Sequence, residues 1–267
     1  MSYSLSVVLF LALSACMKKP TMGRYVPPAE AAWFKFGSFL PEEGQQTLPG
    51  SMAVAIHHAA EHFLPWESTP PAGADAVAIC LLQRQVWDVE TAPWADNSLL
   101  IRFALAPGAC RWGGAPLLDL GATYAVSLHD GRILAVSDAV ARPEGAVPFQ
   151  FPQDLPREKL SLFEANTAAA IELATGDFLA HARGASSDEP PCVAQLSSYD
   201  VTAVSAMEGV NLVRFDLNDR RCPPLGPPSI VEGRKALSPA FVTTYAIELR
   251  TMRILGIELT TRQRIDD

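Results

Sequence analysis

The sequence predicts an α+β fold that is present twice in tandem, and three observations lead to this prediction. Two pairs of cysteines, Cys80/Cys110 and Cys192/Cys222, have the same spacing. The chain also matches itself in three blocks that follow one another in the same order, which is typical of an internal repeat. Within each copy, one stretch with helical periodicity precedes several short stretches rich in β-branched and aromatic residues.

The repeat is visible in three blocks that align without internal gaps, at 11 of 31, 9 of 31 and 7 of 15 positions. The aligned pairs are 34–64 with 149–179, 80–110 with 192–222, and 123–137 with 244–258. Because the blocks keep their order, each copy informs the secondary structure predicted for the other.

The first half of each copy is predicted to form a short strand and then a helix. The alternating Phe34-x-Phe36 suits a strand before Leu40-Pro41. The helix is predicted over 52–64, where apolar residues recur at helical spacing. The second copy repeats that apolar stripe with Ile171, Ala174 and Phe178.

The second half of each copy is predicted to form four strands. In the first copy two of them cover 80–89 and 99–105. A hairpin over 124–128 and 133–137 is expected around the turn signal Asp130-Gly131. Each copy is therefore predicted to have the order β-α-β-β-β-β, with one helix packed on an antiparallel sheet.

The start of the chain indicates the compartment. Residues 4–15 form an apolar stretch that is too short to span a bilayer and is typical of a signal peptide. The following Leu13-Ser14-Ala15-Cys16 resembles the lipobox of bacterial lipoproteins. The resemblance implies that Cys16 is acylated and holds the protein at a membrane. The residue after this cysteine is Met17 rather than aspartate, and the same resemblance implies that such a lipoprotein is sorted to the outer membrane.

Four cysteines remain once Cys16 is assigned to the anchor. An even number of cysteines in an oxidising compartment indicates two disulfides. If the two cysteines of a pair set the register of a hairpin, residues equally far from them lie opposite each other. Cys80–Cys110 would then place Asp88 opposite Arg102, and Cys192–Cys222 would place Asp200 opposite Arg214. This shared register favours pairing within each copy over the two crossed alternatives. Closing such a loop adds roughly 3 to 4 kcal/mol in the chain-entropy account.

These features divide the chain into six predicted segments. They are a signal peptide (1–15), a lipidated tether (16–31), repeat 1 (32–140), a linker (141–146), repeat 2 (147–262) and a tail (263–267).

The order β-α-β-β-β-β, with one helix across an antiparallel sheet, resembles the cystatin-like fold. The final hairpin is similar to the closing strands of the envelope domains called PepSY. Cystatins that inhibit thiol proteases carry Gln-x-Val-x-Gly between the second and third strands. The corresponding loops here, 90–98 and 202–209, lack this motif. The resemblance therefore implies the fold and puts that type of inhibition in doubt.

One motif suggests an enzyme. The sequence His58-Ala-Ala-Glu61-His62 matches H-x-x-E-H, the inverted zinc-peptidase signature, in which a histidine pair on a helix binds zinc and the glutamate acts as base. The second copy has Leu173, Gly176 and Asp177 at these positions, so the fold does not require the motif. We therefore favour a partly exposed patch of His57, His58 and His62, with His58 and His62 as weak metal candidates, and keep a zinc-dependent peptidase as the alternative.

The composition also restricts the function. The formal net charge of −8 disfavours nucleic acid as a partner. The sequence has no G-x-S-x-G motif and no P-loop, and every cysteine has an expected partner or lipid. We expect no catalytic residues and no cofactor. The predicted function is that of a non-enzymatic, lipid-anchored envelope module that binds an envelope protein or peptide or has a structural role.

Overall fold

The computed structural model confirms the α+β class. It describes residues 24–37, 39–95, 97–112, 115–116, 120–137, 151–152, 155–156, 160–182, 191–223, 230–231, 234–235 and 240–262. In these ranges, no helix combines the length and the apolar character needed to cross a bilayer. The duplication itself stays a prediction, and "repeat" below refers to the two predicted copies.

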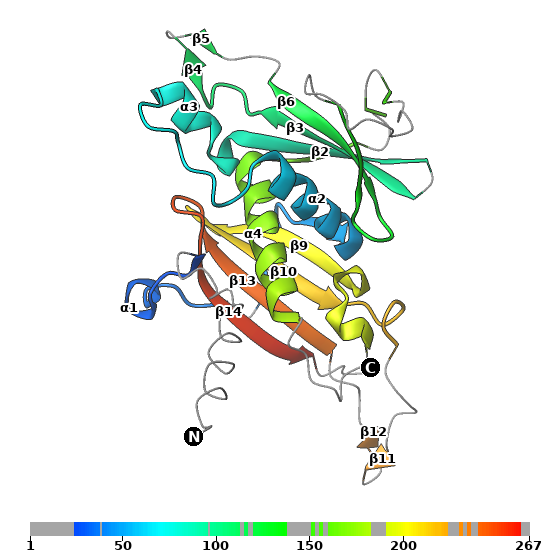
Figure 1. Cartoon of the computed structure of the whole chain (residues 1–267). Coiled ribbons are helices and arrows are strands. Elements are labelled where there is room, and N and C mark those ends of the chain that lie inside the picture. Colours follow the sequence, from blue (N-terminus) through cyan, green and yellow to red (C-terminus); the bar gives the residue numbers. More distant parts are fainter. Residues whose placement is uncertain are drawn as a thin grey trace, which may run out of the picture.

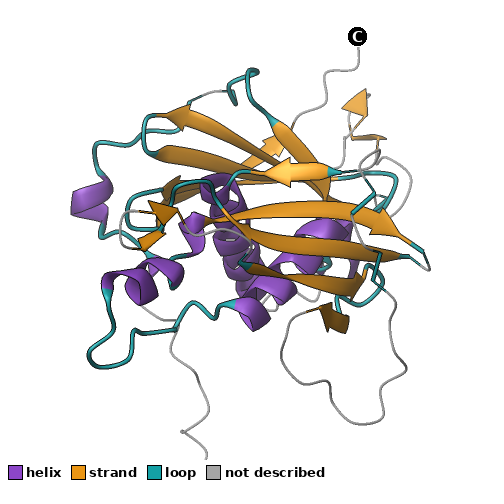
Figure 2. Ribbon diagram, turned by 90° about the horizontal axis from the view of Figure 1, so that it is seen from above, coloured by secondary structure: helices purple, strands orange, loops and turns teal. Residues whose placement is uncertain are grey.

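Two five-stranded antiparallel sheets enclose a layer of two long helices (Figure 1). Seen from above, strands lie across these helices (Figure 2). The first-repeat sheet has the order β7-β6-β3-β2-β8, and the second-repeat sheet has the order β1-β9-β10-β13-β14.

After the N-terminal α1, the described residues of the first repeat form two helices, a 3-10 turn and seven strands. They are α1 (Pro28–Ala31), β1 (Gln46–Pro49), α2 (Gly50–Phe63), α3 (Ala76–Leu81), the 3-10 turn Arg84–Val86, β2 (Trp87–Trp94), β3 (Ser98–Leu105), β4 (Arg111–Trp112), β5 (Ala115–Pro116), β6 (Gly121–Ser127) and β7 (Ile133–Ser137).

The second repeat has the same order of main elements. They are β8 (Ser161–Phe163), α4 (Ala165–Ala182), the 3-10 turns Pro191–Ala194 and Leu196–Ser198, β9 (Tyr199–Met207), β10 (Val210–Leu217), β11 (Ile230–Val231), β12 (Arg234–Lys235), β13 (Ala240–Glu248) and β14 (Arg253–Arg262). The short strands β4 and β5, like β11 and β12, form separate two-stranded ribbons.

The first strand of each repeat lies in the sheet of the other repeat. β1 pairs with β9, where the hydroxyls of Thr47 and Thr202 are 3.1 Å apart. β8 pairs with β2, where Phe163 lies opposite Val89. The predicted order along each repeat is therefore present, but each sheet takes four strands from one repeat and one from the other.

The segments before β1 and β8 cross over in the same way. Phe34, Phe36 and Leu40 pack on the outer face of the second-repeat sheet. Phe151 and Leu155, which align with Phe36 and Leu40, pack on the outer face of the first-repeat sheet. The strand predicted at Phe34-x-Phe36 is wrong, because these residues lie outside any strand and pack their side chains on the face of a sheet.

The two long helices are largely buried, and many of their buried residues are alanines. Helix α2, predicted over 52–64, buries Ala53, Ala55 and Ala59. Helix α4 is buried around most of its circumference, including its polar residues Glu172, Thr175 and Asp177. Each helix contacts both sheets, and the two helices contact each other. The main hydrophobic core is therefore shared by the two repeats.

The predicted strand register is wrong by two residues in the first repeat. Cys80 lies on helix α3, so β2 starts only at Trp87. Arg102 lies opposite Glu90 rather than Asp88, and its guanidinium forms an ion pair with the Glu90 carboxylate. Helical residues between the cysteine and the strand cause this shift.

The second repeat shows the same shift. Arg214 lies opposite Thr202, and Asp200 lies opposite Asp216. Arg214 pairs with Asp216 on its own strand at 2.6 Å. The predicted pair of Asp200 with Arg214 is therefore wrong as well.

Candidate functional site

The three residues of the zinc-peptidase motif contact three different partners. His58 Nδ1 is 2.8 Å from the carbonyl oxygen of Gly131, in the turn after β6. His62 Nδ1 is 3.1 Å from the hydroxyl of Tyr124 on β6. The Glu61 carboxylate is 2.7 Å from the guanidinium of Arg84. Across the described ranges of the chain, no group of three or more His, Cys, Asp or Glu side chains is placed to hold a metal ion.

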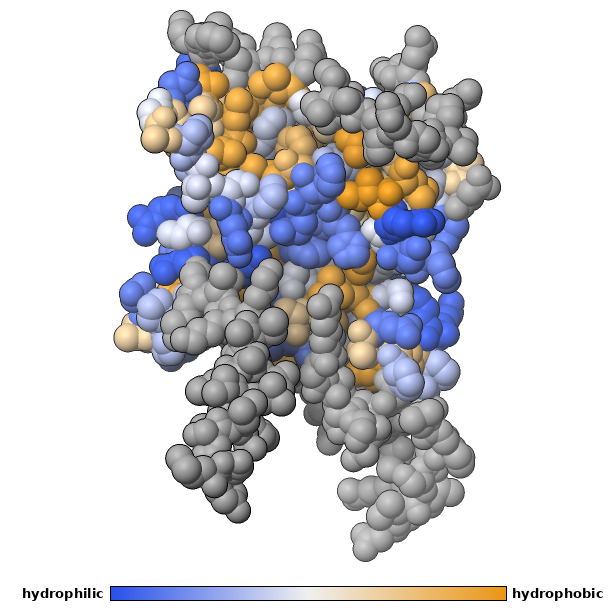
Figure 3. Space-filling model, in the orientation of Figure 1, coloured by the Kyte–Doolittle hydropathy of each residue, from blue (hydrophilic) through white to orange (hydrophobic). Residues whose placement is uncertain are grey.

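Arg84 connects the two repeats in the helix layer. Its side chain is 5% exposed and donates to Glu172 of α4 at 2.6 Å, while it also donates to Glu61 of α2. The guanidinium carbon lies 4.2 Å from the ring centroid of Trp66, a cation–π distance. Together with His57, these residues form what we call the seam cluster. Arg84 and Glu172 are buried beneath the surface, and on the face drawn in Figure 3 hydrophilic residues gather across the middle, at the level of the helices.

Burial controls the protonation of two members of the seam cluster. Burial raises the pKa of Glu172 to about 7, although the nearby Arg84 lowers it. Burial also lowers the pKa of His57 to about 3, and the charges of His58 and Arg84 act in the same direction. At neutral pH the cluster therefore holds a neutral imidazole and a carboxyl group close to its midpoint.

A second polar contact joins Tyr25, which precedes α1, to α4. The Tyr25 hydroxyl donates to the buried carboxylate of Asp177 at 2.6 Å. Burial, together with this hydrogen bond, raises the pKa of Tyr25. Asp177 aligns with His62, and Tyr245, close to Asp177, aligns with Tyr124. Both repeats thus join the same helix position to the same strand position.

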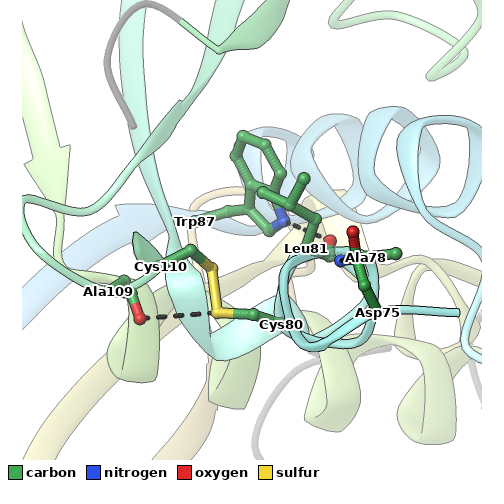
Figure 4. The surroundings of a disulfide bond; sticks show 7 residues. All are labelled: Asp75, Ala78, Cys80, Leu81, Trp87, Ala109 and Cys110. Atoms are coloured by element: carbon green, nitrogen blue, oxygen red, sulfur yellow. Dashed lines mark hydrogen bonds between the residues drawn. A yellow bond between two sulfur atoms is a disulfide. The ribbon is translucent and has the colours of Figure 1, made fainter. Parts of the chain in front are cut away.

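The two disulfides have the predicted pairing. The Cα atoms are 6.0 Å apart in Cys80–Cys110 and 5.5 Å apart in Cys192–Cys222, within the usual range. Figure 4 shows the first bridge beside Trp87, whose indole N–H donates to the carbonyl of Leu81 at 3.1 Å. Each bridge joins the helical segment before a hairpin to the end of that hairpin, so each repeat is closed by its own disulfide.

The remaining predicted site residue, Cys16, lies outside the described residues. Sequence reasoning missed Arg84 and Glu172. Glu172 gave a signal, since it is the one charged residue in the apolar run from Ala168 to Thr175. The sequence around Arg84 gave no such signal, because the equivalent residue in the second repeat is Leu196 and the comparison of the repeats does not single out an arginine.

A groove of about 500 Å³ opens on the first-repeat sheet, away from the seam cluster. Its polar lining includes Arg102, Thr123 and Ser137, and its apolar lining includes Leu105 and Leu120. This volume lies within the range of small-molecule sites.

The chain was compared with protein-family models, curated proteins and solved structures, and none of them matches it.

Proposed function

We propose that this protein is a lipid-anchored component of the bacterial cell envelope that acts as a non-enzymatic binding or structural module. The observation that carries the proposal is the use of the buried charged residues. The buried Arg84 pairs with the buried Glu172 across the two repeats and with the partly exposed Glu61 within the first repeat, so these groups hold the structure together. The disulfides are compatible with an oxidising compartment.

The anchor is tested by metabolic labelling with a palmitate analogue. The parent chain is expected to incorporate the label and to fractionate with the outer membrane, whereas Cys16→Ala abolishes labelling and releases the protein from membranes. Met17→Asp serves as the matched control, since it keeps the acylated cysteine and is expected to move the labelled protein to the inner membrane. Labelling that persists in Cys16→Ala would refute the anchor.

The enzymatic alternative is tested by the metal content of the purified protein. Under the proposed function, zinc is substoichiometric and does not change in His58→Ala. Stoichiometric zinc that is lost in His58→Ala, accompanied by peptidase activity, would instead establish the alternative based on His58, Glu61 and His62.

A further inference from the structure

The outer face of the first-repeat sheet carries a polar row that crosses four strands. Glu90 on β2 lies opposite Arg102 on β3, Arg102 lies opposite Thr123 on β6, and Thr123 lies opposite Ser137 on β7. These side chains point away from the helices, because their neighbours Phe103 and Tyr124 face the core. Three of the four, all but Glu90, line the groove of about 500 Å³.

Arg102 is only partly used by its ion pair. Its Nε donates to Glu90 at 2.7 Å, and its Nη2 contacts the same carboxylate oxygen. Its side chain remains 40% exposed and lines the groove. A guanidinium has five N–H donors in a fixed fork, so the Nη1 edge has donors left for a second acceptor.

The rest of the groove is apolar and includes a glycine at the start of β6. Ala104, Pro107 and Leu120 contribute apolar surface next to the polar row, whereas the side chain of Leu105 packs on the main core. β6 starts at Gly121, where a Cβ would lie 1.8 Å from the carbonyl oxygen of Phe103 and the φ of +148° also favours glycine. The close approach of β3 and β6 thus depends on this glycine.

The second repeat provides an internal comparison. Its sheet has the equivalent row Thr202, Arg214 and Thr244, but the row ends at Glu258 where the first repeat has Ser137. Asp216 and Asp219 align with Ala104 and Pro107. The equivalent positions therefore carry three carboxylates, one of which pairs with Arg214, whereas the groove in the first repeat combines one arginine and two hydroxyls with apolar walls.

We propose that this groove binds a small amphiphilic carboxylate, with the carboxylate on Arg102, Thr123 and Ser137 and the apolar chain on Ala104, Pro107 and Leu120. This inference rests on the proposed function, because a protein held at a membrane is surrounded by amphiphiles. The arginine and hydroxyls match a carboxylate in charge and hydrogen bonding. The acidic equivalent in the second repeat would repel the same group.

The test uses decanoate as the probe and the purified full chain, with binding followed by calorimetry and by amide chemical shifts. Decanoate is expected to shift the amides of Gly121, Thr123 and Ser137. Arg102→Gln is expected to weaken binding about tenfold, the usual scale for a charge-assisted hydrogen bond. Thr123→Val, which preserves shape, should weaken it by a smaller factor.

The controls come from the second repeat and from the head group. Arg214→Gln and Thr244→Val should leave decanoate binding unchanged, and decanol should bind more weakly than decanoate. Equal weakening by Arg102→Gln and Arg214→Gln, equal binding of decanol, or no binding at millimolar decanoate would overturn the proposal. Palmitate labelling of Cys16 is independent of these results, so a failure of the groove and a failure of the anchor are distinguishable.

Discussion

At the scale of single residues, the central feature is one guanidinium shared by two carboxylates. Arg84 and Glu172 are both almost fully buried, whereas Glu61 is 37% exposed. A buried ion pair adds little net stability compared with apolar residues of the same size, but removal of one partner leaves an uncompensated charge. The sequence alone did not predict this pair, because its members come from opposite repeats and each has a different residue type at the equivalent position.

A double-mutant cycle tests this arrangement. Arg84→Met is expected to lower the free energy of unfolding by about 3 to 5 kcal/mol at pH 8, where Glu172 is mostly charged. The double variant Arg84→Met, Glu172→Leu should recover most of that loss, as measured by urea unfolding. If the double variant is as unstable as the single one, Glu172 does not depend on Arg84.

The two shifted pKa values make opposite contributions to stability as pH changes. Glu172 has a pKa raised from 4.5 to about 7, so its contribution is complete below pH 4.5 and is lost as pH rises through 7. His57 has a pKa lowered from 6.5 to about 3, so its contribution is complete above pH 6.5 and is lost as pH falls through 3. The two effects oppose each other between pH 4.5 and 6.5.

Variants separate the two contributions. Relative to the parent, Glu172→Gln should gain stability as pH rises from 4.5 to 7, with a slope of up to about 1.4 kcal/mol per pH unit. His57→Gln should gain relative stability as pH falls from 6.5 toward 3. Urea unfolding at a series of pH values measures both, and profiles that stay parallel to that of the parent would contradict the assignment.

At the scale of elements, the sequence predicted the pieces whose signals are local. The apolar stripe of α2 and the Asp130-Gly131 turn between β6 and β7 depend on neighbours within a few residues, and both predictions are confirmed. The exchange of β1 and β8 was not predictable in this way. When two repeats offer similar sheet edges, a strand pattern states that a strand exists but does not state which edge it joins.

The exchange also gives α4 a cap that comes from the other repeat. The carboxylate of Asp88 on β2 accepts a hydrogen bond from the backbone N–H of Ala165, the first residue of α4, at 2.8 Å. Asp88→Ala is expected to destabilise the protein by about 1 kcal/mol, the usual value for a lost helix cap. Asp75→Ala is the matched control, since Asp75 caps the short exposed helix α3 and its loss should change the unfolding midpoint less. A larger effect of Asp75→Ala would contradict this account.

At the scale of the whole molecule, the two repeats share one core and exchange their first strands. Each disulfide lies within one repeat, so no covalent bridge among the described cysteines joins the two. The connection between the repeats therefore depends on packing, on the exchanged strands and on the pair of Arg84 with Glu172.

Cleavage between the repeats tests this connection. With a protease site in place of residues 141–146, the cleaved protein is expected to elute as one species in size-exclusion chromatography. The same sample should separate into two fragments in urea without reductant. Separation of the fragments in native buffer would show that the shared core does not hold the repeats together.

The pairing of β1 with β9 also affects how the chain folds. The hydroxyl of Thr47 contacts the hydroxyl of Thr202, which lies 155 residues further along the chain. Contacts of such long sequence separation slow folding. Without the second half of the chain, the first half has one sheet without its edge strand and one edge strand without its sheet. The protein therefore reaches its final fold only when both halves of the chain are present together.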